Sequence, residues 1–435
     1  MRIGIAGLGT VGTALCRLLV ENRDAIAIHA GRPIEVVAVT ARDRSRDRGI
    51  DIAGMRFQDD AVGLARDPSI ETFVELIGGD EGPARASVAA ALAAGKHVVT
   101  ANKALIAKHG LTLAAQAEEK GLTLAFEAAV AGGVPAIRTL RDAMTGNRID
   151  RLHGILNGTC NYILTRMEAE GLDFATCLAD AQRLGYAEAD PTFDVDGFDT
   201  AHKLAILASL AFGTRIAAET VYVEGIRAVA PEDIKAAREL GFRIKLLGLA
   251  AISERGLAQR VHPVMVPAGS AIADVDGVLN AVSYHGSAIG DLVLVGPGAG
   301  GEATASAVIA DLTDIARGLV SLPLGRPVEA LGRPAAVSID DHVGAYYIRL
   351  SVTDRPGAFA AIAGRMGNEG ISLESIVQHH ERGATLEAHP PGARKTVILI
   401  TYDTTEAALR RALVAISDDG VIAKAPRVIR IEHFD

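Results

Sequence analysis

A glycine motif near the start of the chain constrains the possible folds more than any other feature. Residues 7–12 read Gly-Leu-Gly-Thr-Val-Gly and follow a short apolar run at residues 2–6, and the apolar residues after them recur with helical spacing. The order strand, glycine turn, helix predicts a turn that binds the pyrophosphate of a dinucleotide. A glycine turn with a purely structural role is the alternative.

Each position of this motif has a physical reason. Gly7 permits the tight turn, Gly9 lets a pyrophosphate approach the backbone, and Gly12 lets the helix pack closely. Thr10 and Val11 lie in the first helical turn, where free N–H groups and the positive end of the helix dipole attract phosphate. We therefore expect all five residues to contact the cofactor.

The end of the next predicted strand bears on the choice between NAD and NADP. An acidic residue there would bind the ribose 2′-hydroxyl of NAD, but Thr40 is followed by Arg42 and Arg44. A guanidinium suits a 2′-phosphate, so the sequence favours NADP(H). A solvated basic loop is the alternative.

The order of the predicted elements indicates an α/β protein with three domains. Alternating strands and helices predict a Rossmann-type, doubly wound sheet over residues 1–134, to which residues of about 300–322 return. Longer helices and β-rich runs predict a mixed α+β catalytic domain over residues 135–299. The proline- and glycine-rich residues 323–344 are expected to be a linker, and residues 345–435 to form a ferredoxin-like βαββαβ domain.

Composition excludes several classes of protein. The 435 residues include 44 Lys and Arg against 53 Asp and Glu, with no long basic run, which argues against binding to nucleic acid or to an anionic membrane. The three cysteines form no C-x-x-C pair, so neither a disulfide framework nor a thiolate zinc site is indicated. We expect no export signal and no membrane span, and hence a cytoplasmic protein that binds small molecules.

The stretch GYAEADPTFDVDGFDTAHKLAIL, residues 185–207, carries the most informative chemistry. Asp199 and Lys203 are spaced i,i+4 at the start of an apolar helix and share one of its faces. An exposed pair would be an ordinary helix ion pair. This helix is apolar nearly all round, however, and a buried lysine beside a carboxylate is a plausible proton donor.

Three further motifs supply candidate site residues. Thr100 and Lys103 follow a predicted strand, where open α/β sheets bind ligands, although an exposed loop lysine is the alternative. Glu127 precedes a glycine-rich bend whose carbonyls could join it in holding sodium, unless the bend is only a crossing between domains. Thr159 opens a helix and could bind a substrate carboxylate. Its neighbour Cys160 could instead be the nucleophile of an acylating semialdehyde dehydrogenase, but no basic partner stands beside it.

Together these motifs resemble the homoserine dehydrogenases of the long bacterial type that carry a C-terminal ACT domain, over almost the whole chain. The resemblance implies a reversible, nicotinamide-dependent reduction of aspartate semialdehyde to homoserine, on the route to threonine, methionine and isoleucine. Hydride addition to an aldehyde creates an alkoxide, which a nearby ammonium can stabilise and protonate. A nucleotide-binding regulator without activity is the alternative outside enzymes.

The resemblance also implies roles for individual residues. Lys203 resembles the proton donor and Asp199 its partner. The residues that resemble substrate contacts are Glu188, Asp194, Thr159 and Lys103. The residues that resemble a sodium site are Glu127, Val130, Gly132 and Val134. The cofactor contacts beyond the glycine turn would be Thr40, Arg42, Thr100, Lys103 and Gly300.

The last predicted domain resembles an amino-acid-sensing ACT module. Asp354, Pro356 and Gly357 lie in the turn after its first strand, where a helix N-terminus would suit an amino-acid carboxylate. The resemblance implies feedback by threonine. Pairing of two such units would cover exposed strand edges, so we expect a homodimer or homotetramer. An ACT unit that serves assembly alone is the alternative.

Overall fold

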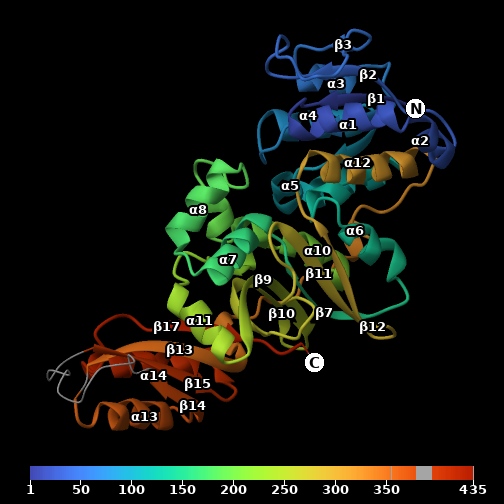
Figure 1. Cartoon of the computed structure of the whole chain (residues 1–435). Coiled ribbons are helices and arrows are strands. Elements are labelled where there is room, and N and C mark those ends of the chain that lie inside the picture. Colours follow the sequence, from blue (N-terminus) through green and yellow to red (C-terminus); the bar gives the residue numbers. More distant parts are fainter. Residues whose placement is uncertain (354, 379–393, 435) are drawn as a thin grey trace.

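The computed structural model describes residues 1–353, 355–378 and 394–434. Figure 1 shows three regions along the chain: an N-terminal α/β domain, a central domain, and a C-terminal unit. Asp354, one of the predicted effector contacts, lies outside the described residues. Within these ranges, no helix has the length and apolar character needed to cross a membrane.

The N-terminal domain is built on a parallel sheet of six strands in the order β3-β2-β1-β4-β5-β6. The Rossmann-type prediction is confirmed. The strands are β1 (Arg2–Ala6), β2 (Glu35–Thr40), β3 (Arg56–Phe57), β4 (Thr72–Glu75), β5 (His97–Thr100) and β6 (Leu124–Ala125). Strand β4 is buried along its whole length, as expected for a parallel sheet with helices on both faces.

Six helices cover this sheet, and one of them comes from far along the chain. They are α1 (Thr10–Glu21), α2 (Arg23–Ala30), α3 (Ala61–Arg66), α4 (Pro83–Ala93), α5 (Lys103–Glu119) and α12 (Gly301–Ala316). Helix α12 packs beside α1, as Figure 1 shows, and buries Val308, Leu312 and Ile315 with the core of this domain. The predicted return of the chain after residue 300 is thus observed.

The central domain combines long antiparallel strands with helices on one face. The strands are β7 (Ile149–Ile155), β8 (Tyr222–Val223), β9 (Phe242–Ser253), β10 (Gly256–Pro267), β11 (Leu279–Gly286) and β12 (Gly290–Pro297). The helices are α6 (Ala136–Arg138), α7 (Gly158–Glu170), α8 (Phe174–Arg183), α9 (Thr192–Val195), α10 (Phe198–Phe212) and α11 (Pro231–Glu239). Helix α10 packs between the sheet and α5, which buries almost all of it.

The C-terminal unit has the predicted βαββαβ order. It comprises β13 (Val343–Thr353), α13 (Ala358–Asn368), β14 (Leu373–Gln378), β15 (Arg394–Thr401), the short β16 (Thr404–Thr405), α14 (Glu406–Asp418) and β17 (Arg427–Ile431). Strand β17 pairs in parallel with β10, Val264 beside Arg430, so one mixed sheet runs from β12 through to β14. The unit is therefore joined to the central domain by backbone hydrogen bonds, which its sequence pattern did not indicate.

The segment predicted to be a linker, residues 323–344, is docked on the rest of the protein. Leu324 and Leu331 are buried. The N–H of Val328 donates to the Glu118 carboxylate, and the N–H of Leu257 donates to the Ala335 carbonyl. The burial of these two leucines and the hydrogen bonds hold the segment against the rest of the protein, despite its prolines and glycines.

Candidate active site

The glycine turn fits a dinucleotide pyrophosphate. Gly7 has a φ of +104°, and a Cβ there would lie 2.4 Å from the Leu76 carbonyl oxygen. A Cβ at Gly12 would lie 2.0 Å from the Gly7 carbonyl oxygen, so α1 packs against the turn only because this residue is glycine. At Gly9 nothing lies within 4 Å of that position. The backbone is therefore open there to an incoming phosphate.

Two adjoining cavities of about 590 and 570 Å³ are both lined by Leu8 and Gly9 of this turn. Thr40 and Arg42 line the first and Thr10 lines the second, as expected of cofactor contacts. Arg46 and Arg48 line both, and the sequence analysis missed them. Arg46 and Arg48 follow Arg44 by two and four residues, and this proximity was the only hint in the sequence. The position of an arginine in a loop cannot be predicted without the fold.

The arginines of this loop have different surroundings. The Arg48 Nε donates to the Leu8 carbonyl at 3.0 Å, which ties the loop to the glycine turn. The Arg44 guanidinium lies over the Phe57 ring, 5.2 Å from its centre. Arg42 is exposed and lines the cavity. Of the two arginines named from the sequence, Arg42 is thus the one that lines the cavity.

A buried carboxylate organises the carboxyl ends of β4 and β5. Glu75 is fully buried and accepts the N–H groups of Ile77 and Gly78 at 2.7 and 3.0 Å. It also accepts the Thr100 hydroxyl at 2.5 Å. Thr100 therefore lies at the predicted edge of the sheet, but its hydroxyl is already engaged. Glu75 was missed because an acid at the end of a short apolar strand has no distinctive sequence signal.

Lys103, Asp199 and Lys203 form a chain of alternating charges. The Lys103 Nζ lies 2.6 Å from Asp199 Oδ1, and the Lys203 Nζ lies 2.8 Å from Asp199 Oδ2. Lys203 Nζ also donates to the Leu156 carbonyl at 2.6 Å. Because an ammonium has three N–H donors, one donor of Lys203 remains for a substrate oxygen. The prediction that this lysine is buried and paired is confirmed by these contacts.

Burial and charge act in opposite directions on the three groups. Burial lowers the pKa of Lys203 below its ordinary value, although Asp199 raises it in part. Burial is the largest single influence on the pKa of Lys103 and lowers it, but the carboxylates of Asp199, Asp194 and Glu188 together outweigh burial, so the net shift is upward. Burial alone would raise the pKa of Asp199, but the two ammonium groups hold it below its ordinary range. Asp199 therefore stays ionised, and Lys203 gives up its proton more readily than an exposed lysine.

The other predicted substrate contacts differ in how deeply they are buried and in how they contact the Lys103, Asp199 and Lys203 side chains. Asp194 is half-buried, and its pKa is raised by burial and by the neighbouring charge of Asp199. Glu188 is exposed on the loop before α9, and its charge raises the pKa of Lys103. The Thr159 hydroxyl donates to the Tyr186 carbonyl at 2.6 Å, so it fixes this loop to α7.

Two aromatic residues cover the lysine side of the site. The Lys103 Nζ lies 5.9 Å from the centre of the Phe193 ring. The His202 ring meets Phe193 edge-on at 5.3 Å between centres. His202 therefore packs against Phe193 of α9.

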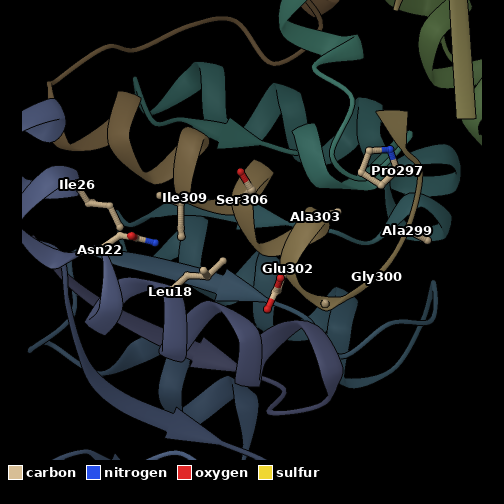
Figure 2. A pocket seen from close by; sticks show the side chains of 11 residues that line it. Leu18, Asn22, Ile26, Pro297, Ala299, Gly300, Glu302, Ala303, Ser306 and Ile309 are labelled. Carbon is tan, nitrogen blue, oxygen red and sulfur yellow. The ribbon is translucent and has the colours of Figure 1, made fainter. Parts of the chain in front are cut away.

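The Gly300 segment, residues 298–301, lies beside the glycine turn, but Gly300 itself, a predicted cofactor contact, does not line the two cavities at that turn. Gly300 has a φ of +112° and precedes α12, and a Cβ at Gly301 would lie 3.0 Å from the Thr10 carbonyl oxygen. Gly300 instead lines a separate cavity of about 790 Å³, together with Leu18 of α1 and with Ser306 and Ile309 of α12. Figure 2 shows these residues. That cavity shares only Gly301 and Glu302 with the cofactor cavities.

The predicted sodium bend lies at the joint between the first two domains. The Glu127 carboxylate accepts the N–H groups of Ile137 and Arg138 at 2.9 and 2.8 Å, so it faces the start of α6. Ala131 and Gly132 both have positive φ, 56° and 49°, and Ala131 is the only such non-glycine residue in the described ranges. The N–H of Gly133 donates to the Pro297 carbonyl. The bend is thus strained and held against the Gly300 segment.

The site and fold together define a nicotinamide-dependent oxidoreductase, with a dinucleotide turn in one domain and a buried ammonium in the next. Residues 135–313 match the family described as homoserine dehydrogenase, and residues 7–127 match the homoserine dehydrogenase NAD binding domain. The chain therefore belongs to the homoserine dehydrogenase family, whose reaction takes place at a CH–OH group.

Individual relatives match most or all of the chain. The chain is 44% identical over 442 residues to a homoserine dehydrogenase of Pseudomonas aeruginosa, covering 100% of this chain and 99% of that protein. The crystal structure of a homoserine dehydrogenase from Thiobacillus denitrificans is similar with a TM-score of 0.92 and 42% identity, over 100% and 99% of the two chains. A hyperthermophilic archaeal homoserine dehydrogenase in complex with NADPH is similar with a TM-score of 0.62 and 27% identity, over 72% of this chain and 96% of that one.

The alternative reactions considered from the sequence are not supported. Cys160 is fully buried, its thiol donates to the Asp194 carbonyl, and burial raises its pKa well above the ordinary value. Such a thiol is a poor nucleophile. The family assignment likewise argues against a regulator without activity.

Proposed function

We propose that this chain reduces L-aspartate 4-semialdehyde to L-homoserine reversibly, with Lys203 as the proton donor. The observation that carries the proposal is the Lys103–Asp199–Lys203 chain, in which a buried ammonium keeps one N–H free. When bound, the reduced nicotinamide supplies the hydride. Lys203 then protonates the oxygen on which negative charge develops, and Asp199 holds Lys203 in place.

The remaining residues are proposed to bind the substrate's own charges. Asp194 and Glu188 suit its ammonium group, and Lys103 completes the electrostatic surroundings of Asp199. The first-turn N–H groups of α7, around Thr159, suit its carboxylate. The direct test follows NADP⁺ reduction at 340 nm with L-homoserine, with L-serine and L-threonine as substrate controls. Absence of homoserine-dependent reduction would refute the proposal.

The cofactor is proposed to be NADP(H) in preference to NAD(H), because Arg42 lines the cavity beside Thr40. Replacing Arg42 by alanine should raise the KM for NADP⁺ about 10- to 100-fold, as expected for the loss of a charged hydrogen bond of about 1.5–3 kcal/mol. The KM for NAD⁺ should stay nearly constant. Arg44→Ala is the matched control, since that guanidinium lies on Phe57. Equal effects of Arg42→Ala on both cofactors would contradict the preference.

A sodium ion is proposed at the bend, held by the carbonyls of Val130, Gly132 and Val134, with the Glu127 carboxylate adding negative charge from its place at α6. Its role would be to stabilise the joint between domains. At ten times its Kd, sodium should add about 1.4 kcal/mol to the free energy of unfolding. Melting temperatures in NaCl and in choline chloride of equal ionic strength measure this. Identical melting curves in the two salts would eliminate the site.

The C-terminal unit is proposed to be an ACT domain that responds to threonine. Gly357, with a φ of +86°, precedes α13, and with Pro356 it forms the exposed turn that could receive an amino acid. Millimolar threonine should lower homoserine oxidation 5- to 150-fold, the range of ordinary allosteric coupling, whereas valine should not. Gly357→Val should abolish the response because a branched residue is strained at that φ. A flat response of the intact protein to threonine would leave the unit with assembly alone, as homodimer or homotetramer.

A further inference from the structure

Asn157 joins the two carboxylates of the site, Asp194 and Asp199. Its Nδ2 donates to Asp194 Oδ1 at 2.9 Å and to Asp199 Oδ2 at 2.8 Å. Its Oδ1 accepts the N–H of Cys160 at 2.8 Å and so caps α7. Asn157 is 5% exposed. Both N–H donors of the Asn157 side chain are therefore used within the site, and its oxygen accepts a hydrogen bond from α7.

We propose that Asn157 is a positioning residue, whose amide holds Asp194 and Asp199 side by side in their ionised forms. A side-chain amide has two N–H donors, and in Asn157 each donates to a different carboxylate. A carboxylate at this position would repel both groups, and a hydroxyl would be too short to bridge them. Asparagine also caps a helix well, which places its amide at the end of β7, between α9 and α10.

The surroundings of Asp194 explain why this bridge matters. Asp199 and Lys203 face it from α10, Lys103 from α5, and the buried Cys160 thiol donates to its backbone carbonyl. Glu188 adds negative charge near Lys103. Burial and Asp199 raise the pKa of Asp194, whereas the Asn157 hydrogen bond lowers it. Without that bond, Asp194 would bind a proton at higher pH and would no longer attract a substrate ammonium.

The inference rests on the proposed roles of Asp194 and Asp199, and three variants test it. Asn157→Ser and Asn157→Asp both keep a good cap for α7 but remove the amide, while Asn157→Ala removes both. Asp173→Ala removes the cap of α8, an exposed position in the same domain, and so measures the effect of losing a cap away from the site.

For Asn157→Ser we expect a melting temperature close to wild type and a kcat/KM for homoserine that is 10- to 100-fold lower. The low-pH limb of kcat/KM should move to higher pH in Asn157→Ser and further in Asn157→Asp, since the added carboxylate opposes ionisation of Asp194. Asp173→Ala should change the melting temperature without moving this limb.

Two outcomes would overturn the inference. One is an Asn157→Ser enzyme with wild-type kcat/KM and pH profile. The other is a loss of activity that follows melting temperature alone across all four variants, with no shift of the low-pH limb. If instead Lys203→Ala retained full turnover, the proposed roles of the site would fail first, whatever the Asn157 variants did.

Discussion

Replacing Lys203 with alanine is expected to lower kcat about 10²- to 10⁴-fold, the usual contribution of a general acid. The Lys203 Nζ donates to Asp199 and to the Leu156 carbonyl, and these two hydrogen bonds fix the ammonium that is proposed to protonate the substrate oxygen. The lost interaction exists chiefly in the transition state, and kcat should therefore fall more than KM rises.

The matched measurement separates chemistry from folding. Titration of the variant with NADPH, followed by fluorescence of the nicotinamide, should give a Kd near that of wild type, because the glycine turn lies in the other domain. Lys203→Met keeps most of the side-chain volume and should be as inactive as Lys203→Ala. Lys108→Ala, which removes an exposed lysine of α5 paired with Asp80, serves as the control with unchanged kcat. A Lys203→Ala enzyme with most of the wild-type turnover would reduce the pair to an ordinary ion pair.

The second large effect is expected at the contact between the C-terminal unit and α11. Asp233 is fully buried and accepts two hydrogen bonds from Arg349, at 2.6 and 3.0 Å, and one from the Tyr347 hydroxyl. Arg349→Met would leave the Asp233 charge buried without its cation. We expect the free energy of unfolding to fall by about 3–5 kcal/mol, as for other buried pairs broken on one side.

A second arginine offers a close control for this experiment. Arg365 also makes two hydrogen bonds to one aspartate, Asp419, at 2.8 and 2.6 Å, but both side chains are partly exposed. Arg365→Met should therefore lower the free energy of unfolding far less than Arg349→Met does. Urea unfolding followed by circular dichroism measures both variants. Equal losses would mean that burial of Asp233 does not set the strength of this contact.

Much of the fold and of the site could be predicted from local sequence pattern. The G-x-G-x-x-G turn, the alternation of strands and helices, and the i,i+4 spacing of Asp199 and Lys203 are local features, and backbone geometry links each to one structure. Gly7 and Gly12 show why, since any side chain there would collide with the backbone within 2.4 Å. Glycine at these two positions therefore predicts the turn directly, because no other residue fits there.

Only the tertiary structure determines which distant residues contact these local features. Asn157 and Asp199 are 42 residues apart, and Lys103 and Asp199 come from different domains, so no spacing could pair them. The parallel pairing of β17 with β10 joins two strands that are far apart in the sequence and are neighbours only in the folded protein. The Glu127 carboxylate faces α6 because free N–H groups lie there. Hydrogen bonds and ion pairs act over a few ångströms in space, whatever the separation along the chain, so only the folded chain determines which charges meet.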